Sequence, residues 1–575
     1  VRDSPADSAV SLRPIGTYET GVFDQSAAEI VHAYKNRLFV VNAQAGAVDV
    51  LDNSNSAAPT KLYSIAGTGV ANSLAVRTDG LGVIALEDAD KTAPGRLVFF
   101  DADATAPTVL GTVTVGALPD MVTISEDGTY AVVANEGEPD DDFTVDPEGS
   151  VGVVSLPAAK TAPTQDAVRT AGFAAFEQGG SQTLDPAVRV FGPDVAAPDQ
   201  GSTPLAANRV SRNLEPEFVA VAGGVAYVTL QEANALAVVD LASAAVTGIR
   251  PLGFKDYGVE TLDASDRDPE DAPTYNQNSH PGLFGMYMPD GIQAYEADGK
   301  TYLVTANEGD GREWGEFNDT ARVKDLGDDG LAPVCADSPL AGSLDDADLG
   351  RLNVATDMGL NAEGTCYSAL YTFGGRGFSV WDTEGNQVFD SGSDFEAITH
   401  DANPDFFNSN HSESNLEGRS DDKGPEPESV TIGELSGRTY AFIGFERVGG
   451  IAAYDITDPA SPDFVTYVNN RDFSQSVEDG GDLPTAGDLG PESITFIPAD
   501  SSPTGIPMLA VGNEVSGTTT LFAIEDALDP IDIDILTIND FHGRIEANGD
   551  EVGAAVLAGA VDAAEAENPN TLFVS

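Results

Sequence analysis

Basic residues are scarce in this chain of 575 residues. It contains 28 Lys and Arg against 94 Asp and Glu, which gives a formal net charge of −66. A polyanion repels phosphate backbones, so this composition argues against nucleic-acid binding through a basic groove and against attachment to anionic membrane surfaces. The carboxylates either form a solvated surface suited to solubility or high salt, or collect divalent cations, which are hard ions that prefer oxygen ligands.

Cysteine and long apolar runs are also scarce. The two cysteines, Cys335 and Cys366, lie in one irregular segment and predict a disulfide formed in an oxidising compartment, with two free thiols as the alternative. No apolar run reaches the roughly eighteen residues that a transmembrane helix needs. No signal peptide is visible, and the chain starts at Val1, as expected of a mature or trimmed protein.

Turn-forming residues are plentiful instead. The 60 Gly and 34 Pro are typical of many turns between short strands, and the hydrophobic share of 41% is sufficient for packed cores. The length predicts at least two domains, although a large β-propeller could take up most of it.

A repeated pattern covers most of the chain. Each copy begins with an acidic residue and a short apolar strand. A turn follows, often with Asp-Gly or Gly-Gly, and leads to a second strand that ends in a Glu-containing tripeptide. A third strand ends in Asp. Seven copies begin near Ala28, Asn72, Pro119, Glu215, Pro289, Pro427 and Pro491. A connector such as TVLGTVTVG supplies a fourth strand. We therefore predict an all-β, seven-bladed β-propeller over residues 1–526, with a linear β-solenoid as the alternative.

The pattern also predicts where the propeller is interrupted and how it closes. Insertions are expected near residues 160–213 and 311–365, and long irregular segments of this kind are usually functional or disordered. The last copy lacks a connector strand. The segment VSLRPIGTYETG, which precedes the first copy, alternates apolar and polar residues as the connector strands do. We therefore expect it to pair with TTTLFAIE, which begins at Thr518, and to cover the exposed edge of the last sheet.

Two rings of carboxylates are predicted at one mouth of the central channel. The first strand of a blade is innermost, and its entry opens on the same face as the turn after the second strand. The first ring, the acids at the start of the first strands, consists of Glu29, Asp120, Glu217, Asp290, Glu428 and Glu492. The second ring, the acids after the second strands, consists of Glu87, Glu136, Glu232, Glu308, Glu446 and Glu514.

So many neighbouring carboxylates must protonate, pair with basic groups or bind cations. One interpretation is structural, with each carboxylate accepting hydrogen bonds from the neighbouring blade. The other is a ligand pocket loaded with a divalent cation, for which calcium is the candidate. Arg312, Arg419 and Lys423 fall next to the ring positions. They either neutralise carboxylates or contact an anionic ligand bridged by metal.

Several motifs resemble one known family. NEGD, RGFSVWD, DSGSDFEAIT, NLEGRSDDKGPEPESV and LEPEFVAV resemble the choice-of-anchor I domain over roughly residues 10–526. The resemblance implies a secreted bacterial β-propeller, often fused to other extracellular modules, but gives no ligand. Phytase-like propellers, which bind calcium in an acidic channel, offer only an analogy.

The chain changes character after Asp526. Residues 533–538 predict a strand, residues 552–564 have helical spacing, and a second strand begins at Thr571. This β-α-β order differs from a blade. Asp540 and His542 follow the first strand, where a carboxylate and an imidazole could share one metal ion.

LTINDFHGR as a whole resembles the first motif of the calcineurin-like metallophosphoesterases, in the form typical of secreted 5′-nucleotidases. The resemblance implies that Asp540 and His542 are metal ligands and that residues 527–575 are the start of a two-metal phosphatase. The remaining ligands and catalytic residues are expected downstream of Ser575, so this site should be inactive here. We therefore predict an extracellular bifunctional metallophosphatase/5′-nucleotidase that hydrolyses nucleotides or other phosphate esters. The alternatives are a cation-dependent propeller that binds a cell-surface ligand, and a phytase-like propeller phosphoesterase.

Overall fold

The computed structural model of this chain describes residues 10–67, 69–141, 144–191, 209–314, 317–526, 535–537, 554–567 and 572–574. The chain divides into two compact units, Val1–Glu525 and Asp526–Ser575, so the predicted boundary after residue 526 lies next to the observed one. Among the described residues, no helix combines the length and apolar character needed to cross a membrane.

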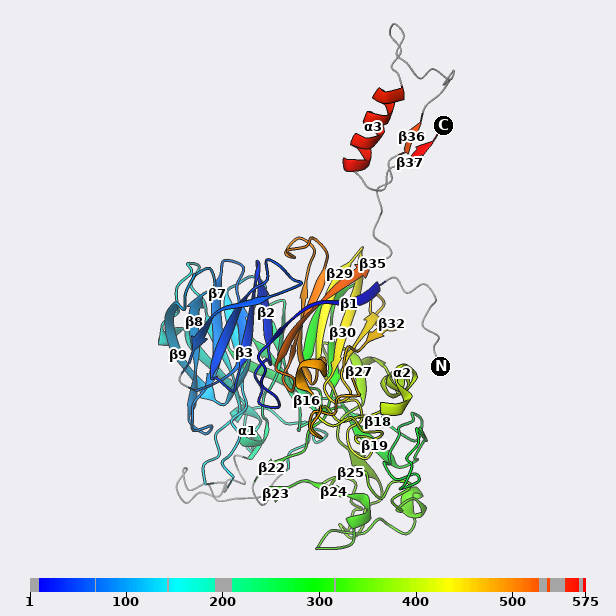
Figure 1. Cartoon of the computed structure of the whole chain (residues 1–575). Coiled ribbons are helices and arrows are strands. Elements are labelled where there is room, and N and C mark those ends of the chain that lie inside the picture. Colours follow the sequence, from blue (N-terminus) through cyan, green and yellow to red (C-terminus); the bar gives the residue numbers. More distant parts are fainter. Residues whose placement is uncertain are drawn as a thin grey trace. The chain divides into compact units, whose positions relative to one another are not determined.

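The first unit is built from four-stranded antiparallel sheets, which we number in chain order (Figure 1). Sheet 1 consists of β2 (Val31–Tyr34), β3 (Arg37–Asn42), β4 (Ala47–Asp52) and β5 (Thr60–Ala66), and sheet 2 of β6 (Val70–Val76), β7 (Leu81–Glu87), β8 (Pro94–Asp101) and β9 (Val109–Ala117). Sheet 3 consists of β10 (Pro119–Ile124), β11 (Tyr130–Asn135), β12 (Ser150–Ser155) and β13 (Val168–Gly172), and sheet 4 of β14 (Val219–Ala222), β15 (Val225–Leu230), β16 (Ala235–Asp240) and β17 (Ala245–Pro251). Sheet 5 consists of β20 (Ile292–Ala297), β21 (Lys300–Asn307), β27 (Gly377–Asp382) and β28 (Gln387–Asp390). Sheet 6 consists of β29 (Pro427–Leu435), β30 (Arg438–Phe445), β31 (Ile451–Asp455) and β32 (Asp463–Val468). Sheet 7 consists of β33 (Pro491–Ile497), β34 (Met508–Asn513), β35 (Thr518–Asp526) and β1 (Val10–Glu19).

Short hairpin turns set the register within these sheets. Gly223 and Gly224, between β14 and β15, both have positive φ, and Ala222 pairs with Val225 across the turn. Two central residues of positive φ match the right-handed twist of the strands they join, and glycine adopts this conformation without strain. The Gly-Gly and Asp-Gly pairs of the sequence pattern therefore mark the hairpins.

The sheets pack face to face in a closed ring. The first strands contact one another in the order β2, β6, β10, β14, β20, β29 and β33, and β33 contacts β2 again. An apolar cluster fills the space between each pair of neighbouring sheets; the one that closes the ring joins Leu38 and Val40 of sheet 1 to Met508 and Leu521 of sheet 7. Four-stranded sheets repeated radially form a β-propeller, so the all-β prediction is confirmed.

The N-terminal strand closes sheet 7, as predicted. β1 pairs with β35 at the edge of the sheet, although the two strands stand at opposite ends of the unit's sequence. The Thr20 amide donates to the Gly517 carbonyl at 3.0 Å, and the hydroxyls of Thr17 and Thr520 lie 3.0 Å apart. Pairing of this kind removes an exposed sheet edge.

The first predicted insertion, residues 160–213, needs correction. It contains β13, which pairs with β12 as the fourth strand of sheet 3. A strand so far from its partner along the chain could not be recognised from local alternation. The segment outside the sheets therefore starts after Gly172 and includes helix α1 (Arg209–Asn213). Short 3-10 turns also occur, at η1 (Gln165–Ala167), η2 (Ala174–Phe176), η5 (Val323–Asp325), η6 (Pro339–Gly342), η7 (Pro404–Phe406) and η8 (Leu483–Thr485).

The second insertion is larger than residues 311–365 and is joined by a segment that was not predicted. The chain leaves sheet 5 between β21 and β27, and residues 252–291 leave between sheets 4 and 5. These segments share one apolar core, in which Tyr257 and Leu262 meet Val354 and Tyr367. Their small sheets contain β18 (Phe254–Asp256), β19 (Leu283–Met286) and β26 (Leu370–Thr372); β22 (Glu313–Trp314) and β23 (Phe317–Asn318); and β24 (Thr320–Arg322) and β25 (Asn353–Ala355).

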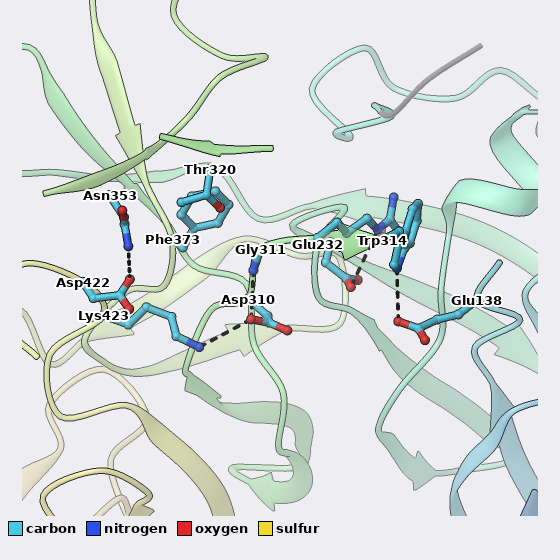
Figure 2. Close-up of a pocket in the computed structure, with 11 residues that line it drawn as sticks. Glu138, Glu232, Asp310, Gly311, Trp314, Thr320, Asn353, Phe373, Asp422 and Lys423 are labelled. Carbon is cyan, nitrogen blue, oxygen red and sulfur yellow. Dashed lines mark hydrogen bonds and ion pairs between the residues drawn. The ribbon is translucent and has the colours of Figure 1, made fainter. Parts of the chain in front are cut away.

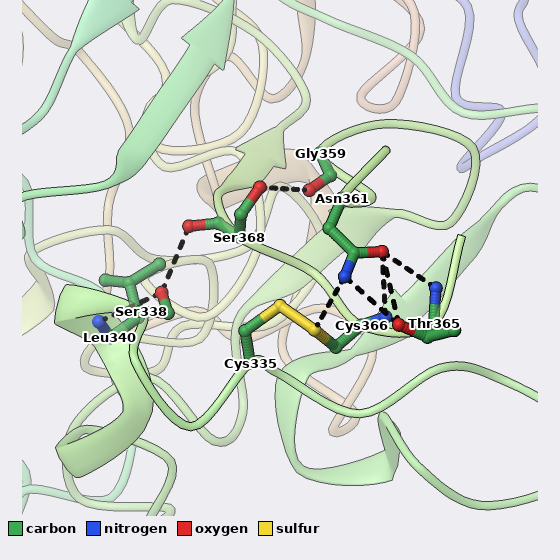
Figure 3. Close-up of a disulfide and its surroundings, with 8 residues drawn as sticks. All are labelled: Cys335, Ser338, Leu340, Gly359, Asn361, Thr365, Cys366 and Ser368. Carbon is green, nitrogen blue, oxygen red and sulfur yellow. Dashed lines mark hydrogen bonds between the residues drawn. A yellow bond between two sulfur atoms is a disulfide. The ribbon is translucent and has the colours of Figure 1, made fainter. Parts of the chain in front are cut away.

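The predicted disulfide lies within this second core. Cys335 and Cys366 are bonded, with their Cα atoms 4.9 Å apart (Figure 3). The Asn361 amide nitrogen lies 3.3 Å from the Cys366 sulfur. Figure 1 shows that the inserted strands and helix α2 (Asp394–Ala402) gather at one end of the ring of sheets. They therefore cover one mouth of the propeller.

The second unit has the predicted β-α-β order. β36 (Ile535–Thr537) pairs in parallel with β37 (Leu572–Val574), and helix α3 (Ala554–Glu567) lies between them in the chain. Parallel neighbours require a crossover connection of this kind. Asp540 and His542 lie outside the described residues.

Candidate functional site

Backbone irregularities place the first-ring carboxylates. In sheets 3, 6 and 7 the first strand begins with Pro-Asp or Pro-Glu, and the ladder shifts register at that point. Asp120, Glu428 and Glu492 are the acids at these shifts. A bulge re-aims the side chain it carries, and proline suits it because it has no N–H to contribute to the ladder. The repeated Pro-acid pair is therefore the local signal for the ring.

The structure brings the first ring together around the channel. Asp120 of sheet 3 is repelled electrostatically by Glu29 of sheet 1 and Asp290 of sheet 5, and Asp290 interacts in the same way with Glu492 of sheet 7. These sheets are not neighbours in the ring, so the carboxylates face one another across its centre. The predicted clustering at one mouth is consistent with these interactions.

Protons are held tightly by the first ring. Burial, followed by repulsion from Glu514 and Asp120, raises the pKa of Glu29 to about 8, although Ser26 opposes the shift. Burial also raises the pKa of Asp120 to about 7. Burial, together with repulsion from neighbouring acids, also raises the pKa of the other four carboxyl groups well above the ordinary value. These groups belong to Glu217, Asp290, Glu428 and Glu492. Ionising the whole ring at neutral pH requires a counter-charge.

That counter-charge is missing from the part of the chain that the structure describes. No first-ring carboxylate is among the ion pairs formed by the described residues. Glu428 is only 8% exposed, yet its Oε2 has no hydrogen-bond partner, and the same is true of the buried Oε2 of Glu217. Buried carboxylate oxygens are normally paired, so these atoms indicate a missing partner.

The second ring is different, because basic side chains reach it from the loops. Lys423 Nζ lies 2.7 Å from Glu308 Oε1, and Arg447 Nη1 lies 3.0 Å from Glu446 Oε1. Arg312 Nε lies 3.7 Å from Glu232 Oε1. Half of the second ring is therefore paired with basic side chains in a network of ion pairs, whereas Glu87, Glu136 and Glu514 are in none of the ion pairs of the described residues. Burial and neighbouring acids raise the pKa of Glu136 well above the ordinary value.

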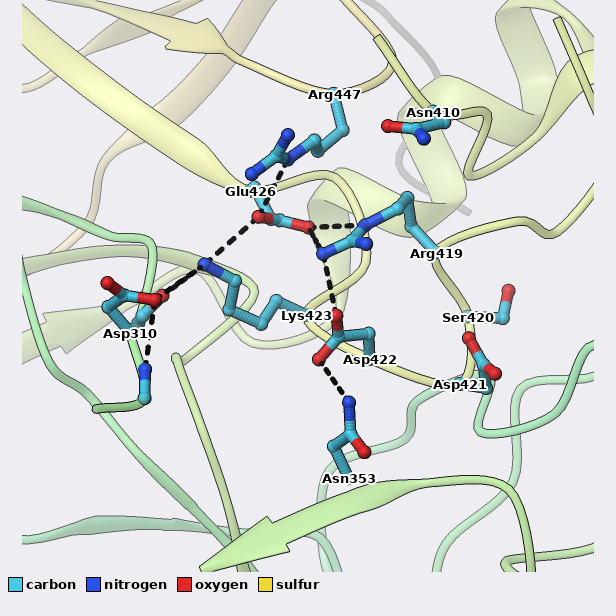
Figure 4. Close-up of polar contacts among 12 residues, drawn as sticks. Asp310, Asn353, Asn410, Arg419, Ser420, Asp421, Asp422, Lys423, Glu426 and Arg447 are labelled. Atoms are coloured by element: carbon cyan, nitrogen blue, oxygen red, sulfur yellow. Dashed lines mark hydrogen bonds and ion pairs between the residues drawn. The ribbon is translucent and has the colours of Figure 1, made fainter. Parts of the chain in front are cut away.

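Glu426 is the centre of this network, and the sequence pattern did not reveal it (Figure 4). Its carboxylate lies 3.1 Å from Lys423, 3.0 Å from Arg447 and 2.6 Å from Arg419. Burial alone would raise the pKa of Glu426, but these three cations hold it far below the ordinary value. The only available signal was its position in the segment PEPE, two residues before Glu428.

The three predicted anion contacts are all engaged inside the protein. Arg419 and Lys423 hold Glu426, and Arg312 pairs with the buried Glu215. The Arg312 guanidinium also lies over the rings of Phe191 and Trp314, at 4.3 and 4.5 Å from their centres. Of the two roles considered for these residues, the contacts match neutralisation of carboxylates.

Two groups of described residues bring three potential metal ligands within 4.8 Å of one another. Glu308, Glu426 and Glu446 form one, and His411, Glu446 and Glu514 form the other. Arg447 contacts Glu426, Glu446 and His411, so cationic side chains already lie at both groups. The first ring has no such side chain in the ion pairs of the described residues.

A cavity of about 370 Å³ opens beside the second ring (Figure 2). Its lining is mostly polar and includes Glu138, Glu232, Asp310, Gly311, Arg312, Trp314, Thr320, Asn353, Phe373, Asp422 and Lys423. Trp314 Nε1 donates to Glu138 Oε1 at 3.4 Å. Trp314 lies outside the repeated pattern, because it comes from a segment that leaves the sheets, whereas Glu138 lies in the copy that begins at Pro119. The cavity is large enough to admit a small polar ligand.

The chain is similar to known proteins over part of its length. Gigasin-3a of Magallana gigas is 33% identical over 198 residues, which are 32% of this chain and 68% of that protein. The mesenchyme-specific cell surface glycoprotein of Strongylocentrotus purpuratus is 31% identical over 240 residues, 36% of this chain but only 30% of that protein. Among solved structures, virginiamycin B lyase from Staphylococcus aureus aligns over 89% of this chain and 99% of its own, with 9% identity and a TM-score of 0.42. A family model described as the choice-of-anchor I domain matches residues 29–459, and the chain therefore belongs to the choice-of-anchor I domain family.

Proposed function

We propose that the first unit is an extracellular, cation-dependent binding module. In this proposal the seven four-stranded sheets are the blades of one propeller, and the first ring holds a divalent cation, most simply Ca²⁺, in the channel. Secretion is supported by the family match and by the Cys335–Cys366 disulfide, because disulfides persist in oxidising compartments. The ligand would be a molecule at a cell surface.

One observation carries this proposal. Burial alone does not separate the two rings, because each contains buried and half-buried carboxylates. Basic partners among the described residues occur only in the second ring, at Glu232, Glu308 and Glu446. If the carboxylates served only as acceptors between sheets, Glu428 Oε2 would have a donor, and it has none. A hard cation with oxygen ligands would supply the missing positive charge.

The bound cation would also explain how so acidic a face could receive a ligand. An ion held by carboxylates keeps open positions for other oxygen atoms, so it can bridge to a carboxylate, sulfate or phosphate group of the ligand. The adjoining cavity would hold the remainder of that molecule. Asp422, Asn353 and Thr320 offer it hydrogen-bonding groups there.

The test compares two glutamates of strand β29. Calcium should raise the melting temperature of the chain by mass action, and chelator should lower it. Glu428→Gln should remove most of that response, whereas the matched Glu434→Gln, at an exposed position of the same strand, should keep it. Equal calcium responses in the two variants would overturn the proposal.

We propose as a second function that the C-terminal unit begins a two-metal phosphoesterase, so that the protein containing this chain is a secreted metallophosphatase of the 5′-nucleotidase kind. Support comes from the order of β36, α3 and β37, in which β36 contains the first two residues of LTINDFHGR, Leu536 and Thr537. Asp540 and His542 then follow a strand in the sequence, where this chemistry needs its first metal ligands. Asp540 and His542 would bind the metals.

This second function has its own assay. A natural protein that extends beyond Ser575 should release phosphate from a nucleoside monophosphate when a divalent metal is present. His542→Ala should remove most of the activity, and Glu428→Gln should leave it unchanged. Full activity in the His542 variant would refute the role of that residue. Phosphate release by the isolated 575-residue chain would instead favour a catalytic propeller.

A further inference from the structure

A second group of unpaired oxygen atoms lies outside the channel, where two loops meet. Glu417, between helix α2 and strand β29, is 0% exposed, and neither of its carboxylate oxygens has a hydrogen-bond partner. A buried carboxylate normally accepts several hydrogen bonds. Glu417 accepts none from the residues that the structure describes.

The neighbours of Glu417 are also acidic. Asp263, Asp268, Asp266 and Glu396 all repel it electrostatically. Burial first, and then this repulsion, raises the pKa of the Glu417 carboxyl to about 9. No basic group approaches Glu417 itself among the described ion pairs, which distinguishes it from Glu426 in the network described above.

The other acids of the group have partners of their own. Glu396 is 2.6 Å from Arg376, and Asp266 is 2.9 Å from Arg351. Asp263 accepts a hydrogen bond from the Asn276 amide at 2.6 Å. The nearby cations are therefore already engaged, and Glu417 is left without compensation.

Two further oxygens in the same region lack donors. The Asn408 side chain is fully buried, and its amide nitrogen donates to Glu396 at 3.2 Å and to Ser420 at 2.9 Å, which fixes its orientation. Its Oδ1 has no partner, nor does the buried Oδ1 of Asp268. Protonation of Glu417 would supply one donor at most, which leaves several oxygen acceptors unmatched.

We propose that a structural Ca²⁺ ion binds at this group, with the Glu417 carboxylate as its central ligand and the unpaired oxygens of Asp268 and Asn408 as further ligands. Calcium accepts carboxylate and amide oxygens together, in flexible geometry, with water or backbone carbonyls completing the shell. The three-ligand groups around Glu446 are more tightly gathered, but they already contain basic side chains. At Glu417 the ion supplies a counter-charge that no ion pair of the described residues provides, and its binding draws the mutually repelling oxygens together.

The ion would have a definite structural role. Arg376 connects the two loops by donating to the backbone carbonyls of Asp263, Ser420 and Asp422, at 2.6 to 2.7 Å. The loop that contains Glu417 also supplies Lys423 to Glu308. An ion that binds Glu417 and Asp268 would connect the same loops a second time, and so hold Lys423 and Glu426 in place beside the channel.

The ion content of the purified 575-residue chain tests the proposal. After dialysis against calcium-free buffer, elemental analysis should find one Ca²⁺ fewer per chain in Glu417→Gln than in the wild type. The matched control is Glu363→Gln, at an exposed position of the inserted segment, and it should retain the full content. Glu428→Gln should keep the ion at Glu417 whether or not the channel binds one, so the two sites are distinguishable.

A second measurement does not depend on the folding of one variant. Tb³⁺ occupies calcium sites and emits light when a nearby aromatic ring is excited. Tyr275 lies near the site, because the charges of Glu396 and Asp263 add to the effect of burial in raising the pKa of its hydroxyl. The wild-type chain should give sensitised Tb³⁺ emission, and added Ca²⁺ should lower it by displacing the Tb³⁺ ion. Tyr275→Phe should reduce the emission because it changes the excited ring. Asp268→Asn should reduce it because it weakens Tb³⁺ binding. Equal Ca²⁺ content in Glu417→Gln and wild type, or emission unaffected by Asp268→Asn, would overturn the proposal.

Discussion

Lys423 Nζ and Glu308 Oε1 lie 2.7 Å apart although 115 residues separate them in the chain. Both side chains are almost completely buried, and Lys423 also donates to the Gly309 carbonyl at 2.6 Å. This ion pair joins the loop between α2 and β29 to the end of β21. It therefore holds the loop before β29 beside the second ring.

Lys423→Met should be strongly destabilising, because it removes the cation paired with the buried Glu308. It also removes one of the three cations that contact Glu426. Removal of one partner from a buried pair costs about 3–5 kcal/mol. The free energy of unfolding from urea denaturation is the measurement. Lys35→Met is the matched control, since its pair with Asp103 is solvent-exposed, and little change is expected there. Similar losses in both variants would show that Lys423 has no special structural role.

Glutamine substitutions should separate the two rings. Glu308→Gln breaks the pair with Lys423, so it should lower stability whether or not calcium is present. Glu428→Gln removes a carboxyl group that must either stay protonated in the folded chain or repel its acidic neighbours, so the calcium-free chain should become more stable, not less. Thermal unfolding of both variants, with calcium and with chelator, gives the comparison. The assignment of structural and cation-binding roles is wrong if the two variants behave alike.

The repeat and its closure could be predicted from the sequence because both depend on local features. Alternating apolar residues, hairpin turns such as Gly223-Gly224 and the Pro-acid pairs recur in each copy, and β1 has the alternation of a connector strand. β13 was not predicted, because an irregular segment separates it in the chain from its partner β12 and because only one of its residues is buried. The ring positions were predictable for the same reason as the strands, since their place in the repeat is constant.

The partners of those carboxylates could not be predicted. Whether Glu308 meets a lysine depends on a loop that the chain reaches much later, and the repeat holds no information about it. The unpaired state of Glu417 is equally invisible in the sequence, because it results from which donors are absent once two loops have packed together. Asp540 and His542 remain predictions from a motif, since they lie outside the described residues.

The stability of the calcium-free chain should fall as pH rises. The pKa of Asp120 is raised to about 7 and that of Glu29 to about 8, both mainly by burial. These groups hold protons in the folded chain that the unfolded chain has already released, so their stabilising effect is complete below their unfolded pKa values and is lost as pH rises through 7 to 8. The melting temperature in chelator should therefore be lower at about pH 8 than at about pH 5.

Calcium should reverse this trend, because a cation competes with protons for the same oxygens and binds more tightly as they leave. The gain in melting temperature on adding calcium should thus be larger at the higher pH. A calcium-free chain whose stability rises over the same range would contradict the raised pKa values of the first ring.

Loss of the disulfide should loosen the inserted core rather than the propeller. Cys335 and Cys366 are 31 residues apart, and a bridge that closes a loop of this length typically contributes about 2–4 kcal/mol. The double change Cys335→Ala, Cys366→Ala should therefore raise amide hydrogen exchange around Leu352 and Val354, which pack in that core. Exchange in β3 and β7 should stay slow. Uniformly faster exchange would mean that the two cores unfold as one unit.

The pairing of β1 with β35 makes the N-terminal strand a structural part of the last sheet. Leu12 is buried in the apolar cluster between sheets 6 and 7, with Phe522 and Ile524. Leu12→Ala should cost about 2–5 kcal/mol, the range for a buried leucine, and Arg13→Ala under about 1 kcal/mol, because its pair with Glu525 is exposed. Deletion of residues 1–19 should in addition expose the edge of β35 and promote association between chains, which light scattering would detect. A deletion variant that stays monomeric and equally stable would show that the ring closes without β1.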